Sequence, residues 1–361
     1  MKVLHILYSG LGGHGNVFSS MVLSQVANEF DHEALFYGVE PLRQEFIDLC
    51  NRQVIPWNYV KKNVKLDLKY YYRIYRLIRK SKPDVIFVHG SGKVIPARLA
   101  KMFSGKKQKI IVRETQANHL KTATQWVALS ASMLLAHRIV CLTEEFKLQV
   151  KRKLGWLFRA KKVMVIPNGI NLHTYQPSAN SRNQSRIIGM QSRLQAIKDH
   201  TTLLKAFALL PEEERMQTKL KIAGDGDYKN VLISEASALG IAERVEFTGT
   251  LSEDELVDFL NSLDLYVHAS LGETMSTAIM QAMACRLPVV ASDVSGINNM
   301  IQDGITGILV PPQHEEKLAN AIQQCLHDPA LCESLAKNAW EFAQCNFSNE
   351  SMLAAYKRIF L

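Results

Sequence analysis

The chain has 361 residues, of which 47% are hydrophobic and 21% charged, which argues against disorder and predicts two globular domains. Its six cysteines are scattered without a C-x-x-C pair, which disfavours structural zinc and a disulfide framework. No apolar run is long enough to span a bilayer, which disfavours a membrane-spanning protein. The net charge of +9 is uneven, because residues 1–168 hold 28 Lys and Arg against 11 Asp and Glu, whereas the remainder holds 15 against 23.

Short apolar runs alternate with segments of helical length through the first half of the chain. The first run, VLHIL, is followed by glycines and resembles a strand rather than a secretory signal, so we expect a cytoplasmic protein. Further strand-like runs are HEALFYG, PDVIFVH, KIIVRE, HRIVCLT and KVMVIPNG. Such alternation predicts a parallel, doubly wound sheet, and hence a Rossmann-like domain at residues 1–168.

The same alternation restarts after a polar stretch at 169–184, which contains Pro177 and a run of Ser and Asn and is predicted to be a linker. The second set of strand-like runs is RIIGMQSRL, LKIAGDG, RVEFTGT, LDLYVHAS, LPVVASD and TGILVPP. These runs predict a second Rossmann-like domain at 185–345. The last segment, 346–361, has a cap candidate in Ser348 and helical spacing; it either ends the second domain or crosses back to the first.

A glycine-rich loop, YSGLGGHGN, follows the first strand. Gly10, Gly12 and Gly15 fit G-x-G-x-x-G between a strand and a helix, an arrangement that binds phosphate. In a dinucleotide-binding domain an acidic residue follows the second strand, and Glu40 lies near that position. An NAD-dependent oxidoreductase that uses this loop is therefore one functional class that the first domain leaves open.

The stretch SLGETMSTAIMQAMACRLPVVASDVSG at 270–296 predicts an anion site in the second domain. A short turn follows Glu273, and a helix opens near Ser276 at the carboxyl edge of the sheet, where free backbone N–H groups favour an anion. Arg193 and Lys198 lie in the loop directly after the first strand of this domain. They would clamp a diphosphate there, the alternative being two solvated basic residues.

Taken in order, these motifs resemble the retaining GT-B glycosyltransferases of family 4. SRLQAIKDHTTLLKAF resembles the family's GRL…K element, IPNGIN its IPNGVD element, and ETMSTAIMQAMACRLPVVASDVSG its E-x7-E block. The resemblance covers nearly the whole chain. It implies the α/β fold called GT-B, in which two Rossmann-like doubly wound domains face a cleft, the first binding the acceptor and the second a nucleotide-sugar donor.

The resemblance implies a set of donor-binding residues in the second domain. Arg193 and Lys198 match the pair that binds the donor diphosphate, and the backbone amides of Met275, Ser276 and Thr277 match those that hold its distal phosphate. Because such cations and amides act where charge develops on the departing diphosphate, they can replace a divalent ion. We therefore expect no metal and no other cofactor.

Three further donor contacts follow from the same resemblance. Glu273 matches the catalytic acid that faces the transferred sugar, and Leu251 matches the position that packs against the base. Gln281 stands where the family has a second acid at the ribose hydroxyls. A carboxylate accepts hydrogen bonds from both ribose hydroxyls, whereas an amide accepts at one atom and donates from the other. Because the ribose contact supports binding, the glutamine should change the affinity for the donor rather than the breaking of the sugar bond. An inactive, degenerate member of the family is the alternative.

In the first domain the resemblance implies contacts to sugar and acceptor. Gly12 and Gly13 match a Gly-Gly pair whose bare backbone lets the acceptor and the donor phosphate approach closely. His89 ends the strand PDVIFVH and matches a catalytic histidine near the transferred sugar; a structural histidine is the alternative. The candidate acceptor contacts are Gly12, His14, Arg113, Glu114 and Asn118.

Other polar motifs are interpreted as structural. Asp225 and Asp227 in AGDGD have the D-x-D spacing of metal-dependent glycosyltransferases of another fold, but the flanking glycines favour a tight turn. No other carboxylate or histidine cluster has metal-ligand spacing. His268 in LDLYVHAS is interpreted as a packing or surface residue.

Two basic segments predict where the first domain docks. YVKKNVKLDLKYYYRIYRLIRKSK at 59–82, read as a helix, has an apolar and aromatic side beside a basic one, which suits an anionic bilayer; KLQVKRKLGWLFRAKK at 147–162 repeats the pattern. The alternatives are a solvated basic surface and a nucleic-acid-binding protein, although no nucleic-acid motif appears. We predict a peripheral enzyme on the inner face of the cytoplasmic membrane. It moves a sugar from a nucleotide-sugar, with UDP favoured as the carrier, to a lipid-linked or oligosaccharide acceptor. The product would serve O-antigen, capsule or exopolysaccharide synthesis.

Overall fold

The structure is a computed structural model of the chain, and it describes residues 1–10, 13–24, 29–63, 67–178 and 186–361. The chain divides into two compact units, the first formed by Met1–Gly169 with Asn349–Leu361 and the second by Ile170–Ser348. The segment 169–184 was expected to be a linker. Its described residues from 170 to 178 belong instead to the second unit. Gly12 and residue 185, where the second domain was expected to begin, lie outside the described residues.

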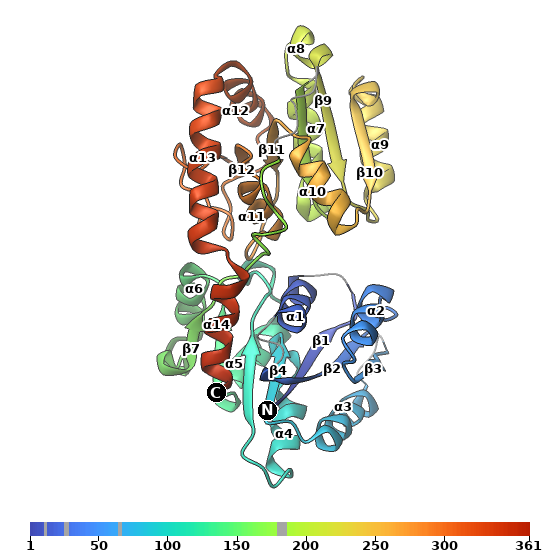
Figure 1. The fold of residues 1–361 in the computed structure, drawn as a ribbon, viewed down its shortest axis with the longest axis vertical. Helices are drawn as coiled ribbons and strands as arrows, with labels where there is room; N and C mark the ends of the chain where they lie inside the picture. Colours follow the sequence, from blue (N-terminus) through green and yellow to red (C-terminus); the bar gives the residue numbers. More distant parts are fainter. Residues whose placement is uncertain (11–12, 25–28, 64–66, 179–185) are drawn as a thin grey trace. The chain divides into compact units, whose positions relative to one another are not determined.

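The first unit is built on one parallel sheet. Its strands are β1 (Lys2–Tyr8), β2 (Asp31–Gly38), β3 (Trp57–Lys61), β4 (Val85–His89), β5 (Lys109–Arg113), β6 (Arg138–Cys141) and β7 (Val163–Val165). They lie in the order β3-β2-β1-β4-β5-β6-β7 (Figure 1). The six predicted strands are confirmed, and β3 is an addition.

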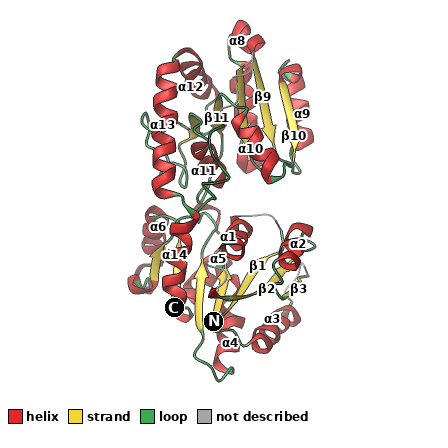
Figure 2. Cartoon of the chain, viewed as in Figure 1, coloured by secondary structure: helices red, strands yellow, loops and turns green. Residues whose placement is uncertain are grey.

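Helices cover both faces of this sheet, as Figure 2 shows. They are α1 (Gly13–Leu23), α2 (Gln44–Arg52), α3 (Leu68–Ser81), α4 (Val94–Met102), α5 (Ala123–Leu135), α6 (Glu144–Leu154) and α14 (Asn349–Phe360), with 3-10 turns η2 (Ser91–Lys93), η3 (Asn118–Leu120), η4 (Gly155–Leu157) and η5 (Ala160–Lys162). Helices α1 and α14 share a core with one face of the central strands, whereas α3, α4, α5 and α6 share a core with the other. The final helix thus belongs to the first unit, where the Tyr356 and Phe87 rings lie 5.2 Å apart.

The segment 59–82 is not one helix, which corrects the sequence prediction. Residues 59–61 end strand β3, as their β-branched and aromatic neighbours favour. Helix α3 begins only at Leu68. The preceding residue, Asp67, caps it, because the Asp67 carboxylate accepts a hydrogen bond from Tyr70 N at 2.9 Å. Tyr70, Ile74 and Ile78 are buried in the core, so the apolar side of this helix is already occupied.

The second unit repeats the architecture with six strands, all of which were predicted. They are β8 (Arg186–Gln191), β9 (Thr218–Ala223), β10 (Val245–Gly249), β11 (Leu265–His268), β12 (Val289–Ser292) and β13 (Ile308–Val310), in the order β10-β9-β8-β11-β12-β13. The helices are α7 (His200–Ala208), α8 (Glu212–Gln217), α9 (Lys229–Ala238), α10 (Glu253–Asn261), α11 (Thr277–Ala284), α12 (Glu315–His327) and α13 (Pro329–Asn346), with 3-10 turns η6 (Ala196–Lys198) and η7 (Ala242–Arg244).

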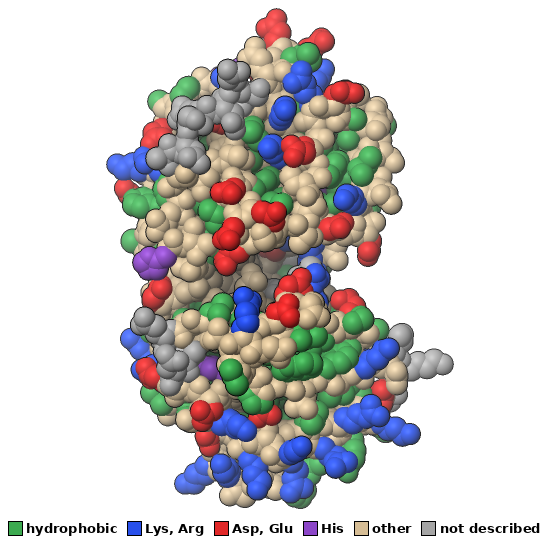
Figure 3. All heavy atoms as spheres, turned by 45° about the vertical axis from the view of Figure 1, so that its right-hand side comes forward, with side chains coloured by type: hydrophobic (Ala, Val, Ile, Leu, Met, Phe, Trp, Pro, Cys, Tyr) green, Lys and Arg blue, Asp and Glu red, His purple; other side chains and the backbone are tan. Residues whose placement is uncertain are grey.

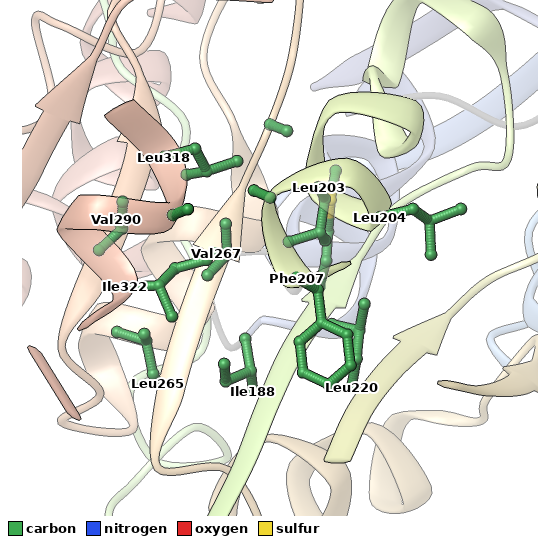
Figure 4. Close-up of a cluster of buried hydrophobic side chains, with 14 of the residues drawn as sticks. Ile188, Leu203, Leu204, Phe207, Leu220, Leu265, Val267, Val290, Leu318 and Ile322 are labelled. Carbon is green, nitrogen blue, oxygen red and sulfur yellow. The ribbon is translucent and has the colours of Figure 1, made fainter. Parts of the chain in front are cut away.

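The core of the second unit fixes the strands that carry its loops. Figure 4 shows Ile188, Leu220, Leu265 and Val267 of the sheet packed against Phe207 of α7 and its neighbours. In both sheets the strand order reverses between two adjacent central strands, β1 and β4 in the first and β8 and β11 in the second. At such a switch point the loops diverge from the carboxyl edge and leave room for a ligand.

Candidate active site

Two opposite charges meet at the switch point of the second sheet. Lys198 lies in the loop after β8, and its Nζ donates a hydrogen bond to Oε1 of Glu273, in the loop after β11. The loops are tied together by Leu271 N, which donates to the carbonyl oxygen of Ile197 at 2.9 Å. Burial acts to raise the pKa of Glu273, but the charge of Lys198 and a hydrogen bond from His268 outweigh it and lower that pKa to about 2. Glu273 is therefore an anion at neutral pH.

The Glu273 loop is held from two other sides. Gly296 passes directly under it with a φ of +90°, where a Cβ would collide with the Glu273 carbonyl group. His268, which is fully buried at the end of β11, places Nε2 at 3.1 Å from Glu273 Oε1 and 3.3 Å from Ser276 Oγ. His268 is buried, as expected of a packing residue, but it also contacts two residues of the candidate site.

The start of helix α11 lies beside these groups. Ser276 caps the helix, because its Oγ accepts from Ile279 N at 3.4 Å. Its own backbone N–H donates to the Met300 sulfur at 3.3 Å, and a thioether is a weak acceptor. Met275 and Ser276 are buried and Thr277 is half-buried. A phosphate would offer the Ser276 amide a stronger partner than this sulfur.

Arg193 leads the loop that ends at Lys198, and its side chain is exposed. The backbone of this loop packs on the turn after β9, where Leu194 N donates to Asp225 O at 3.0 Å and Gly224 has a φ of +133°. Asp225 and Asp227 thus lie in a tight turn. Among the described residues, no ion pair includes Arg193 and no cluster of three or more His, Cys, Asp or Glu is arranged to hold a metal ion.

The remaining donor candidates lie farther along the same unit. Gln281 is buried on α11 beside the hydroxyl group of Tyr175. Leu251 is half-buried just after β10, the edge strand, three places from β11 in the sheet order. The structure therefore brings Lys198, Glu273 and Ser276 together, whereas Leu251 lies at the far side of the sheet.

In the first unit, His89 is the end of a row of three histidines. His5 Nδ1 lies 3.4 Å from His89 Nε2, and His5 Nε2 lies 2.8 Å from His32 Nδ1. Burial is the main cause that lowers the pKa of His5 and of His89, so both are neutral at neutral pH. His89 Nδ1 is buried and has no hydrogen-bond partner within the described part of the chain.

The candidate acceptor residues differ in their surroundings. Arg113 is 1% exposed and donates to Asn168 Oδ1 beneath helix α14, which does not favour contact with an acceptor. Glu114 is also buried, and its Oε2 accepts from Ser91 Oγ at 2.5 Å. Asn118 donates to Gln149 Oε1 at 2.9 Å.

Two parts of the glycine-rich loop are described. Gly13 begins α1, and His14 Nε2 lies 3.1 Å from the carbonyl oxygen of Tyr8 at the end of β1. The first unit therefore presents its candidates at the carboxyl edge of its own sheet, as the strand pattern predicts.

Two lysines of the first unit with buried side chains were missed by the sequence analysis. Lys93 Nζ lies 4.2 Å from the centre of the Tyr37 ring and is also faced by the rings of Tyr70 and Tyr71. Burial lowers the pKa of Lys93 to about 8. Lys121 donates to Asn118 Oδ1 at 2.9 Å and lies 3.7 Å from Glu114 Oε1. No spacing rule points to either, although Lys93 follows the strand that ends in His89.

Two known sequence families match consecutive parts of the chain. Residues 11–174 match the family described as Glycosyltransferase Family 4, and residues 173–342 match the one described as Glycosyl transferases group 1. The chain belongs to the family 4 type of glycosyltransferases. The oxidoreductase and nucleic-acid-binding alternatives receive no support from these matches.

Individual relatives of this glycosyltransferase agree on the class. An alpha-D-kanosaminyltransferase from Streptomyces kanamyceticus is 35% identical over 156 residues, which are 43% of this chain and 40% of that relative. The UDP-Gal:alpha-D-GlcNAc-diphosphoundecaprenol alpha-1,3-galactosyltransferase of Escherichia coli is 24% identical over 290 residues, covering 75% of this chain and 74% of the relative. The chain spans about half the length of the first curated relatives that it matches.

A solved structure defines the fold. The Anabaena protein HepE, crystallised with UDP and glucose, superposes with a TM-score of 0.84 at 20% sequence identity, covering 99% of each chain. The glycosyltransferase therefore has the GT-B fold, as the sequence predicted.

Proposed function

We propose that this glycosyltransferase moves a sugar from a UDP-sugar to a lipid-linked glycan, without a metal ion and with retention of the anomeric configuration. The observation that carries the proposal is the Lys198–Glu273 pair at the switch point of the second sheet, beside the start of α11. Two similar proteins support the choice of substrates: HepE was solved with UDP and glucose, and the Escherichia coli relative is named for UDP-Gal and a diphosphoundecaprenol-linked acceptor.

The donor site works by offering positive charge to the diphosphate. Arg193, Lys198 and the amides at 275–277 act where negative charge develops as the sugar leaves. A diphosphate would draw Lys198 away from Glu273, since both anions compete for one ammonium group. Glu273, still held by His268, would then accept hydrogen bonds from the sugar hydroxyls.

Retention follows from substitution on a single face of the sugar. Double displacement needs a carboxylate nucleophile about 5 Å from a second carboxyl group. In the described part of the chain, the groups that contact Glu273 Oε1 are instead Lys198 Nζ and His268 Nε2. In the proposed step the bond from the anomeric carbon to the phosphate oxygen breaks and a bond to the acceptor oxygen forms on the same face. The acceptor proton passes to the departing phosphate.

The cellular role in this proposal is the synthesis of O-antigen, capsule or exopolysaccharide, with the enzyme bound peripherally at the inner face of the cytoplasmic membrane. Within the described residues, no helix combines the length and apolarity that crossing a bilayer requires. The diphosphoundecaprenol carrier in the name of the Escherichia coli relative supports a lipid-linked acceptor.

A thermal-shift panel with UDP, GDP, ADP and NAD tests the proposal. A ligand that binds only the folded state raises the melting temperature, so UDP should stabilise wild type and NAD should not. Arg193→Ala should abolish the shift and lower kcat by about 10²–10³, the usual effect of removing one group that stabilises a developing oxyanion. EDTA should leave activity unchanged. Stabilisation by NAD alone, or strict metal dependence, would contradict the proposal.

A further inference from the structure

Helix α4 is apolar on its exposed side. Ile95, Leu99, Met102 and Phe103 recur at helical spacing on that side, and Met102 and Phe103 are 62% and 60% exposed. The opposite side of α4 is also apolar, because Val94, Ala97 and Ala100 are buried in the core. A helix that packs on a sheet normally turns a polar side to water, so the exposed side of α4 is adapted to some other environment.

The exposed apolar residues continue onto the neighbouring elements. Helix α5 packs beside α4, and it exposes Val127 and Leu134. The turn η4 packs beside α5, and its Trp156 is 80% exposed. We call these residues of α4, α5 and η4 together the α4–α5 face.

Basic groups border this face. They are Arg98, Lys101, His137, Arg138, Arg159 and Lys162. Lys101 Nζ lies 3.0 Å from His137 Nε2, and Lys162 Nζ donates at 3.0 Å to the carbonyl oxygen of Leu134 on α5. Burial first, and then repulsion by neighbouring cations, lowers the pKa of Lys101, His137 and Lys162.

Within the described residues, none of these six groups forms an ion pair with a carboxylate. Like charges gathered without counter-ions destabilise the folded state, so an anionic partner would stabilise it. Figure 3 shows many Lys and Arg side chains over the first unit.

We propose that the α4–α5 face docks on an anionic lipid bilayer. A bilayer surface offers acyl chains to the apolar residues and negative headgroups to the basic border at the same time. A nucleic acid would satisfy the basic groups only, leaving Met102 and Phe103 in water. The proposal deepens the proposed function, on which it rests for the lipid-linked acceptor. It also replaces helix α3 as the docking element, because the apolar side of α3 is buried.

The test is co-sedimentation with vesicles of phosphatidylglycerol and phosphatidylcholine, and with vesicles of phosphatidylcholine alone. The apolar variant is Met102→Ser with Phe103→Ser, and the charge variant combines Arg98→Gln, Arg138→Gln and Arg159→Gln. The matched controls are Arg73→Gln, Arg76→Gln and Lys80→Gln on the exposed side of α3, and Val231→Ser with Ile233→Ser on α9. All of these side chains are exposed except Arg98, which is half-buried.

Wild type should sediment with the anionic vesicles only. The charge variant should bind them about 100-fold more weakly, at roughly fivefold per basic residue, and the apolar variant at least about tenfold more weakly. The controls should bind like wild type. Wild-type protein that ignores anionic vesicles, equal losses in the α3 control, or tighter binding to duplex DNA or RNA through the same residues would overturn the inference.

The UDP thermal shift, measured on the same variants, keeps the two proposals apart. An unchanged UDP shift in a variant that no longer binds vesicles shows that the fold and the donor site are intact and supports the docking face. Loss of vesicle binding together with the UDP shift assigns the effect to unfolding and would overturn the claim that these residues act only at the surface. Absence of any UDP shift in a wild type that still docks would contradict the proposed function and leave the docking inference standing.

Discussion

Tyr266 and Glu273 contact the same buried histidine from opposite sides. The Tyr266 hydroxyl lies 3.2 Å from His268 Nδ1, and Glu273 Oε1 lies 3.1 Å from His268 Nε2. Burial lowers the pKa of His268, so the ring is neutral and has one N–H group. Because a carboxylate only accepts, Nε2 carries the proton and Nδ1 is left as an acceptor. The Tyr266 hydroxyl also donates to the carbonyl oxygen of Gln191 at 3.2 Å, so it is the contact with Glu273 that fixes the tautomer of His268.

Substitutions of His268 distinguish a role in orienting Glu273 from a role in filling space in the core. His268→Leu should lower kcat by about 10–100-fold, because a hydrogen bond to a charged group contributes about 1.5–3 kcal/mol. It should also raise the pKa of Glu273, which ¹³C NMR of the labelled carboxyl group measures directly. His268→Gln places an amide donor near the Nε2 position and should retain most activity. If leucine and glutamine variants behave alike, the histidine only fills space.

The Lys198–Glu273 pair should be visible in acid unfolding. The pKa of Glu273 falls from its ordinary 4.5 to about 2, so the stabilisation is complete above pH 4.5 and is lost as the pH falls towards 2. A shift of this size corresponds to about 3 kcal/mol. Lys198→Met should therefore unfold at lower urea concentration than wild type at pH 7 and show less loss between pH 4.5 and 2. The exposed Lys219→Met is the matched control. Identical urea midpoints for Lys198→Met and wild type at pH 7 would disprove the coupling.

The buried Lys93 should also make the free energy of unfolding rise with pH, but in the alkaline range. The pKa of Lys93 falls from 10.5 to about 8 on burial, so the unfolded chain binds more protons between these values and stability rises with pH there. Lys93→Met removes the buried charge and should raise the free energy of unfolding at pH 7 by about 1–3 kcal/mol, with the gain fading towards pH 10.5. Lys107→Met, at an exposed site, should change little. Urea titrations at pH 7, 9 and 10.5 measure this, and a gain that does not depend on pH would refute the assignment.

Gln281→Glu restores the acid found in the resembled family. The substitution should keep activity and lower the donor KM or leave it unchanged, because a carboxylate accepts hydrogen bonds from both ribose hydroxyls. Initial rates measured against donor concentration give the KM and the activity of the variant and so test this prediction. Complete inactivation would show that Gln281 does not face the ribose; its contact with the Tyr175 hydroxyl would then be its main role.

Much of the fold follows from the sequence because buried parallel strands are short apolar runs. Strand β3 was missed because WNYVK is followed by lysines, and the segment 59–82 therefore resembles one basic amphipathic helix. The apolar exposed side of α4 was also missed, since VIPARLAKM carries the same apolar content as a core helix. Spacing alone does not say which side of a helix faces water.

Within the site, the meeting of Lys198 and Glu273 was predictable, because loops after adjacent central strands converge at one edge. His268 was not, because every residue of β11 is buried and alternation gives no signal. The burial of Arg113 depends on Tyr356 of α14, which lies far away along the chain. Contacts of that kind appear only once the final helix is placed.

Calorimetric titration of UDP into wild type and Lys198→Met tests the central claim most directly. If the loop after β8 receives the donor diphosphate, wild type should bind UDP with one site per chain. Removing the ammonium group should weaken that binding by about 10–100-fold, as expected for a charge-assisted hydrogen bond. Equal affinity of the two proteins for UDP would contradict the account.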